Sequence, residues 1–188
     1  MKLEKILSQK RSVILKEWLD KIFQTYPAYS SRFLKKQKDR FANPVGYTLS
    51  NDIESLYDEL ILGKGLDSDK VTPALDRIIK IRAIQDFSAS DAVAFIFFLK
   101  ETIRDVLKKN IPNGDLIREL IDFEAKVDRL ALIAFDVYVK CRERIYELKA
   151  NHAKNQVSGL LRRSGLTCEI PEWESCPAED NNHHNVTS

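Results

Sequence analysis

Apolar residues recur at helical spacing along most of the chain, and the breaks in this pattern divide it into about six segments. The first apolar stripe predicts a helix over residues 3–26, which Pro27 would end. Five further helices are expected over residues 28–38, 44–62, 71–85, 89–109 and 116–163. The pattern therefore predicts an all-α fold: a globin-like or orthogonal helical bundle with a long C-terminal helix.

Local residue choices mark the ends of several of these helices. Asn43 can cap free backbone N–H groups, and Pro44 occupies the first helical position, where its missing donor costs nothing. Gly63 is expected to end that helix in a left-handed conformation. Ser88 precedes Asp91 by three residues, close to a capping box. Residues 92–99 are apolar on nearly every helical face, which indicates the most buried helix.

The last predicted helix carries a sustained heptad pattern. Its apolar positions are separated alternately by four and three residues: Leu116, Leu120, Phe123, Val127, Leu130, Ala134, Val137 and Cys141. A helix from residue 116 to 163 would be about 72 Å long, longer than a compact domain is wide. We therefore expect residues 151–164 to protrude and a homodimer to form through residues 116–148.

Charge divides the chain into two unlike parts. The sequence has 30 basic and 28 acidic residues, but five of the acidic residues and none of the basic ones lie in residues 165–188. The helical body thus carries a net charge of +7 and the tail −5. We expect a helical sensor-like domain over residues 1–150, a protruding helix end over 151–164, and a flexible acidic tail over 165–188.

Several classes of function lack their sequence features. The N-terminus resembles no secretory signal, and the longest apolar run, residues 92–99, is too short to span a bilayer, so we expect a cytoplasmic protein without membrane insertion. No glycine-rich phosphate loop occurs, and no histidine precedes His152. We therefore predict no enzyme, no catalytic residue and no cofactor, haem included.

Polar candidates for binding are few, and each has an ordinary structural alternative. Cys168, Cys176, His183 and His184 are possible zinc ligands, but their spacing matches no known zinc module, so no metal is predicted; a redox pair of the two cysteines stays open.

Charged residues suggest two further sites. Arg82 and Asp86 are four residues apart, which indicates a helix-stabilising ion pair or, if buried, contact with a small ligand. A basic C-terminal stretch predicts contact with an unknown protein partner, with a solvated surface as the alternative and no specific nucleic acid expected. Its interaction candidates are Arg144, Lys149, His152, Arg162 and Arg163.

Two sequence blocks, residues 40–46 and 81–95, resemble the N-terminal sensory domain of RsbRD-type RsbT co-antagonist proteins. The resemblance covers roughly residues 10–150. It implies an all-helical module, related in architecture to haem-free globins, that dimerises and passes its state through its last helix to a C-terminal STAS domain in a stress-signalling assembly. It implies no catalytic residues. The signature positions, which we interpret first as structural, are Asn43, Pro44, Arg82 and Asp86.

The chain departs from the family pattern after its last helix, where the acidic tail leaves no room for a STAS domain. We therefore expect a stand-alone version. The leading hypothesis is a non-enzymatic regulatory module that dimerises and contacts other proteins. The alternatives are a small-molecule sensor with a pocket between helices, and an accessory protein of a redox or membrane-associated complex.

Overall fold

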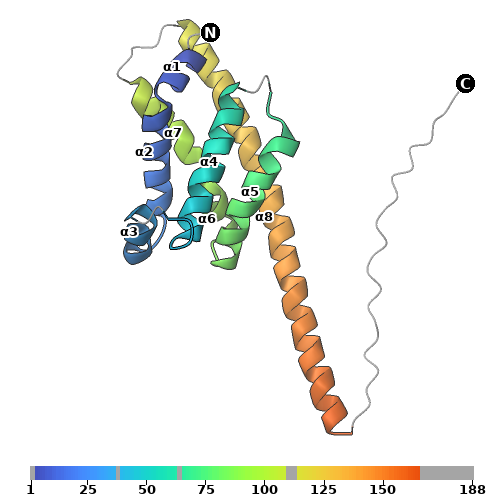
Figure 1. Ribbon diagram of the computed structural model, residues 1–188. Helices are drawn as coiled ribbons and strands as arrows, with labels where there is room; N and C mark the ends of the chain where they lie inside the picture. The colour runs from blue at the N-terminus through green and yellow to red at the C-terminus, as the bar shows by residue number, and fades with distance from the viewer. Residues whose placement is uncertain (1–2, 37–38, 63–64, 109–113, 166–188) are drawn as a thin grey trace, which may run out of the picture. The chain divides into compact units, whose positions relative to one another are not determined.

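The computed structural model describes residues 3–36, 39–62, 65–108 and 114–165, and the regular secondary structure within these ranges is entirely helical (Figure 1). This confirms the predicted all-α class and the long C-terminal helix, which has 50 residues. The helices are α1 (Leu3–Gln9), α2 (Arg11–Gln24), α3 (Ala28–Lys36), α4 (Pro44–Leu62), α5 (Ser68–Ile84), α6 (Ala89–Ala94), α7 (Phe97–Leu107) and α8 (Gly114–Arg163).

Two of the six predicted segments are each divided into two helices. The first divides at Lys10, where the backbone still bonds in helical fashion on both sides: Lys10 N–H to the Ile6 carbonyl at 2.9 Å, and Ile14 N–H to the Lys10 carbonyl at 3.0 Å. The prediction of one continuous helix over residues 3–26 was therefore wrong in detail, and α1 and α2 are joined by a single residue.

The predicted helix over residues 89–109 is also two helices, because a side chain from α2 takes one of its carbonyl groups. The buried Trp18 donates its indole N–H to the Phe95 carbonyl at 2.6 Å. The neighbouring amides form tighter bonds to the residue three positions back: Ile96 to Val93 and Leu99 to Ile96. Thus α6 ends at Ala94 and α7 begins at Phe97.

The core lies where α2, α4, α5 and α7 meet. Helix α2 packs against both α4 and α7, α4 packs against α5, and α1 packs on α4 (Figure 1). The largest fully buried side chains include Trp18, Tyr57 and Phe95. The apolar segment 92–99 is largely buried, as its composition predicts, although Phe97 stays partly exposed.

The chain divides into two compact units, residues 1–146 and a unit that begins at Glu147. The described part of the second unit, residues 147–165, is the last portion of α8, whose side chains are mostly exposed. Gly165, with a φ of +74°, follows the helix end as glycine commonly does. The predicted tail beyond it, and the predicted stop at Gly63, lie outside the described residues. None of the described helices is both long and apolar enough to cross a membrane.

Candidate functional site

The predicted heptad seam of α8 faces the chain's own domain. Val127, Leu130 and Ala134 have no exposed surface, and Leu116 and Phe123 are buried in the same core cluster. The expectation that this seam contacts a second chain is wrong for that reason: its apolar surface is already covered within the protomer. A homodimer through residues 116–148 has to use another face of the helix.

That other face of α8 is also apolar, and it is exposed. Ile117, Ile121, Leu132, Phe135 and Val139 are 46%, 61%, 68%, 46% and 37% exposed. At roughly 100° per residue these five positions fall within about 60° of one another around the helix. We call these five residues the outer face of α8. Monomeric proteins rarely keep large contiguous apolar patches in water, so the outer face is the strongest candidate for an interaction surface in the described chain.

Ion pairs with α7 divide the outer face into two halves. Arg104 binds Glu124 through two hydrogen bonds of 2.7 Å each, and Lys100 binds Asp128 at 2.9 Å. Glu124 and Asp128 lie between the apolar pair Ile117 and Ile121 and the apolar residues from Leu132 onward. The pairs join α7 to α8 and leave both apolar halves uncovered.

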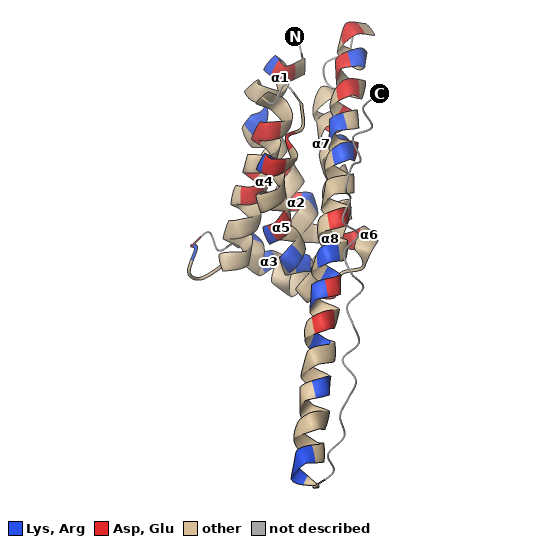
Figure 2. Ribbon diagram, turned by 90° about the vertical axis from the view of Figure 1, so that its right-hand side faces the viewer, with Lys and Arg blue, Asp and Glu red and all other residues tan. Residues whose placement is uncertain are grey.

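The predicted basic interaction residues of α8 are all exposed. Figure 2 shows lysine and arginine positions along the last turns of this helix. In the second unit, an apolar set at spacings of three, four and three residues accompanies them: Ala150, Ala153, Val157 and Leu160. The exposed basic candidates are Arg144, Lys149, His152, Arg162 and Arg163.

Asn43 and Pro44 form the start of α4 that the sequence predicts. The Asn43 side chain accepts the Gly46 N–H at 2.9 Å and donates to the Leu34 carbonyl at 3.1 Å, and it is 1% exposed. The cap thus also ties α3 to α4. A Cβ atom at Gly46 would collide with the Asn43 side chain, so glycine is needed there for space.

Arg82 is fully buried, and its guanidinium does not bind Asp86. It donates to the Asp91 carbonyl at 2.8 Å and to the Thr25 hydroxyl at 3.0 Å. Its charge lies over three aromatic rings, with Phe87 closest at 4.7 Å. Burial lowers the pKa of Arg82, because the surrounding side chains replace water around the charge. The predicted i, i+4 ion pair was therefore wrong.

Asp86 instead ends α5. Its φ of 59° is left-handed, its N–H bonds to the Ala83 carbonyl at 3.4 Å, and the following Phe87 N–H bonds to the Arg82 carbonyl at 3.2 Å. These two bonds define a Schellman motif. The chain reverses so that the Phe87 ring comes back against Arg82.

Two side chains of α8 hold this junction between α5 and α6. Tyr138 donates its hydroxyl to the Phe87 carbonyl at 2.8 Å, and Arg142 pairs with Asp86 at 3.3 Å. Arg142 also donates to the Tyr146 hydroxyl at 2.8 Å, and this bond is the main reason that the pKa of Arg142 is raised. The signature residues Arg82 and Asp86 therefore lie at a contact between the domain and α8.

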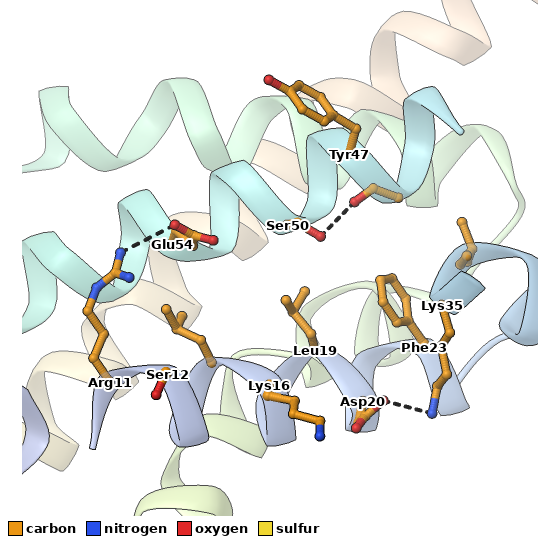
Figure 3. A pocket seen from close by; sticks show the side chains of 13 residues that line it. Arg11, Ser12, Lys16, Leu19, Asp20, Phe23, Lys35, Tyr47, Ser50 and Glu54 are labelled. Carbon is orange, nitrogen blue, oxygen red and sulfur yellow. Dashed lines mark hydrogen bonds and ion pairs between the residues drawn. The ribbon is translucent and has the colours of Figure 1, made fainter. Parts of the chain in front are cut away.

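The largest groove lies between α2 and α4 and has a volume of about 560 Å³ (Figure 3). Its floor is apolar, and its charged groups are largely offset within the groove. Lys35 pairs with Asp20 at 2.8 Å, and Arg11 contacts Glu54 at 3.4 Å. Because these charges already have partners, the groove contains no cluster of unpaired groups that would point to a ligand.

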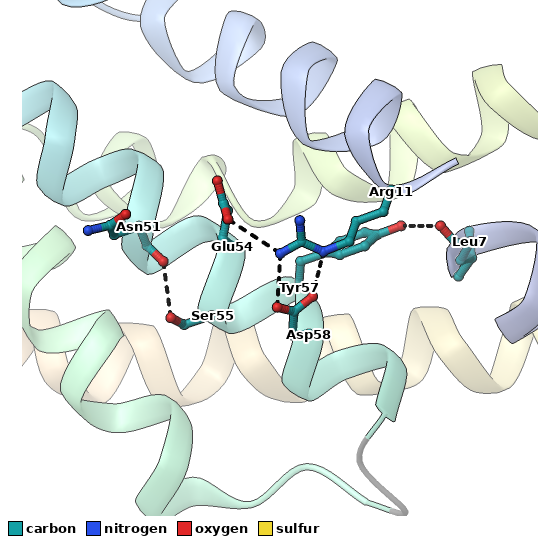
Figure 4. Close-up of polar contacts among 7 residues, drawn as sticks. All are labelled: Leu7, Arg11, Asn51, Glu54, Ser55, Tyr57 and Asp58. Atoms are coloured by element: carbon teal, nitrogen blue, oxygen red, sulfur yellow. Dashed lines mark hydrogen bonds and ion pairs between the residues drawn. The ribbon is translucent and has the colours of Figure 1, made fainter. Parts of the chain in front are cut away.

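Arg11 and Tyr57 fasten the N-terminal helices to α4 (Figure 4). Arg11 binds both carboxylate oxygens of Asp58, at 2.8 and 2.9 Å, and this bond raises its pKa. The Tyr57 hydroxyl donates to the Leu7 carbonyl at 3.1 Å. Burial raises the pKa of Tyr57, since the ionised phenolate would lose its hydration. These contacts stabilise the fold.

Metal-binding candidates are not brought together in the described residues. No group of three or more histidine, cysteine or acidic side chains could hold an ion there. Cys168, Cys176, His183 and His184 lie outside the described residues. Cys141 is a partly buried free thiol packed against the core, and desolvation raises its pKa.

Comparison with known proteins identifies the family. The model of the RsbT co-antagonist protein RsbRD N-terminal domain matches residues 12–152. An uncharacterised protein of Archaeoglobus fulgidus is 25% identical over 144 residues, which cover 74% of this chain and 82% of that protein. No solved structure matches. The chain therefore belongs to the RsbRD N-terminal domain family, a regulatory, non-catalytic kind of domain.

Proposed function

We propose that the chain is a non-enzymatic signalling module that acts through protein–protein contacts and forms a homodimer through α8. The outer face of α8 carries this proposal, because it keeps five large apolar side chains in contact with water. Burying such a face against a second copy removes apolar surface from water at no cost to the existing core. The cytoplasmic location expected from the sequence is part of the same proposal.

A second copy suits the outer face because the face lies on one long helix. An isologous pair would place the same apolar side chains opposite one another across a two-fold axis. The set at Ala150, Ala153, Val157 and Leu160 has the alternating three- and four-residue spacing of a coiled coil. Small alanine side chains there permit close approach of two helices.

Regulation requires that the domain and its last helix influence each other. Tyr138 and Arg142 bind the junction between α5 and α6, so a rearrangement at that junction alters the contacts of α8. The basic residues of the second unit would then recruit a partner with an acidic surface, and this contact should weaken with added salt.

The dimer is tested by changing one residue of the outer face. Wild-type protein is expected to show twice the 21.7 kDa chain mass by light scattering at micromolar concentration. Leu132→Glu should give the single-chain mass, because a carboxylate at the centre of an apolar contact loses its hydration. Leu132 is 68% exposed in the protomer, so the substitution should leave the helical circular-dichroism spectrum unchanged.

Leu62→Glu is the matched control, since Leu62 is 70% exposed at the end of α4, away from the outer face. It should keep the mass of the wild type. A wild-type monomer, or a dimer that survives Leu132→Glu, would contradict the proposed interface.

The two alternative functions differ in their structural support. An accessory role in a redox or membrane-associated complex would rest on Cys168, Cys176, His183 and His184, which lie outside the described residues. Small-molecule sensing has support of its own in the buried residues Tyr26 and Arg82.

A further inference from the structure

Two buried polar atoms without a hydrogen-bond partner occur among the described residues, and both belong to one cluster. They are the Tyr26 hydroxyl and Nε of Arg82. Tyr26 is 7% exposed and Arg82 is fully buried. Leaving a buried donor unpaired is costly, so native proteins rarely do so without a bound water molecule or a ligand.

The same cluster contains a positive charge that no carboxylate contacts. The hydrogen-bond partners of Arg82 are a hydroxyl group and a backbone carbonyl, and no acidic side chain among the described residues lies within ion-pair distance. Asp91 acts on it only over a longer range. The guanidinium lies 5.6 Å from the centre of the Tyr26 ring, so its charge also acts on that residue's hydroxyl. The cluster thus has room for one negative charge in its electrostatic balance.

A cavity of about 220 Å³ adjoins Tyr26. Its walls are mainly apolar and aromatic, and it opens to solvent beside Tyr29, which is 86% exposed, and Phe33, which is 48% exposed. The remaining wall includes Pro44, Val45 and Gln85. The volume suits a small molecule, and the walls suit an apolar one.

We propose that this cavity binds a small monocarboxylate with an apolar body. Its carboxylate accepts a hydrogen bond from the Tyr26 hydroxyl, its charge is offset by Arg82, and its body lies against Tyr29 and Phe33. A single positive charge matches a singly charged acid, whereas a phosphate would bring a second negative charge into an apolar cavity. None of the lining residues belongs to α8, so the site is independent of the proposed dimer interface.

Benzoate is the probe, and benzamide is its neutral counterpart of the same shape. Titration of the full ¹⁵N-labelled chain should show that benzoate shifts the amide signals of residues 26–34 and 43–45. Benzamide should bind at least tenfold more weakly. Tyr26→Phe should weaken benzoate binding at least tenfold, because a hydrogen bond to a charged acceptor is lost.

Tyr47→Phe is the matched control, since Tyr47 lines the groove between α2 and α4 and not this cavity. It should bind benzoate as the wild type does. Without ligand, Tyr26→Phe should melt at the same temperature as the wild type or higher, because it removes an unpaired buried hydroxyl.

Four outcomes would overturn the proposal. They are an absence of benzoate binding, equal affinity for benzamide, a loss of less than tenfold in Tyr26→Phe, or a melting temperature of that variant below the wild type. The first would mean that the polar cluster holds only water. The dimer mass can be measured on the same samples, so failure of this site is distinguishable from failure of the proposed function.

Discussion

Asn43 joins three parts of the domain through one small side chain. Its oxygen caps α4 at Gly46, and its nitrogen holds the last turn of α3 at Leu34. The sequence predicts the cap, because a cap involves only neighbouring residues. It does not predict the need for glycine at position 46, since that depends on the orientation of the Asn43 side chain.

Gly46→Ala should destabilise the domain by about 2 kcal/mol, because the added methyl group displaces Asn43 from both hydrogen bonds. Urea unfolding followed by circular dichroism measures this loss. In an Asn43→Ala background, the same substitution should cost less than about 0.5 kcal/mol, because the colliding atoms are gone. Equal costs in both backgrounds would show that the collision is not the cause.

Tyr57 should make the stability of the domain depend on alkaline pH. Burial raises its pKa above the ordinary value of 10.0, so above pH 10 the unfolded chain releases a proton that the folded chain keeps. The unfolded state then binds fewer protons, and the free energy of unfolding falls as the pH rises. The contribution is fully present below pH 10 and is lost progressively above it.

Tyr57→Phe tests this dependence. At pH 8 the variant should be about 1 kcal/mol less stable than the wild type, because the hydrogen bond to Leu7 is missing. Between pH 10 and pH 11 this deficit should shrink by about 1 kcal/mol, since phenylalanine cannot ionise. Urea midpoints at pH 8, 10 and 11 give the comparison, and a deficit that stays constant would argue against the effect.

At the scale of helices, the position of a break depends on a residue 77 positions away in the sequence. Trp18 holds the Phe95 carbonyl, and the tighter turn at that point separates α6 from α7. The apolar pattern of residues 89–109 has no breaker at this position, so helical periodicity alone predicts one helix. The division is imposed by tertiary packing.

Trp18→Phe should destabilise the domain by about 2–4 kcal/mol, because it leaves the Phe95 carbonyl without its donor and opens a cavity in the core. Phe41→Leu is a suitable comparison, since Phe41 is 92% exposed, and it should change stability by less than about 0.5 kcal/mol. Thermal unfolding of the two variants checks both values, and similar melting temperatures would contradict the assignment.

The end of α5 explains two signature residues that the sequence could only relate by spacing. Spacing of four residues on a helix predicts that Arg82 and Asp86 pair. The helix ends between them in a Schellman motif, which turns Asp86 outward to Arg142 and leaves Arg82 inside among aromatic rings. Residue spacing carries contact information only while the helix continues.

At the scale of the whole molecule, α8 presents apolar residues on two faces, and only one of them is used within the domain. The heptad seam through Val127 and Leu130 is buried, while the outer face through Leu132 and Phe135 is exposed. Both faces repeat with helical periodicity. A periodic pattern reports that a face is apolar and says nothing about whether the covering surface belongs to the same chain.

The sequence by itself determined what depends on near neighbours. The all-α class, the extent of α8, the cap at Asn43 and the start of α6 after Ser88 all rest on hydrogen bonds within a few residues, so local composition predicts them. The two blocks around residues 40–46 and 81–95 likewise indicated the family that residues 12–152 match.

Only the tertiary structure decided which apolar face of α8 is buried, where α6 ends, and what surrounds Arg82. Each of these depends on residues far apart in the sequence: Trp18 with Phe95, and Arg82 with Thr25 and Tyr26. Buried polar groups take whichever partners packing brings near, because an unpaired group is costly. The unpaired hydroxyl of Tyr26, which suggests a ligand, could therefore emerge only once the helices were packed together.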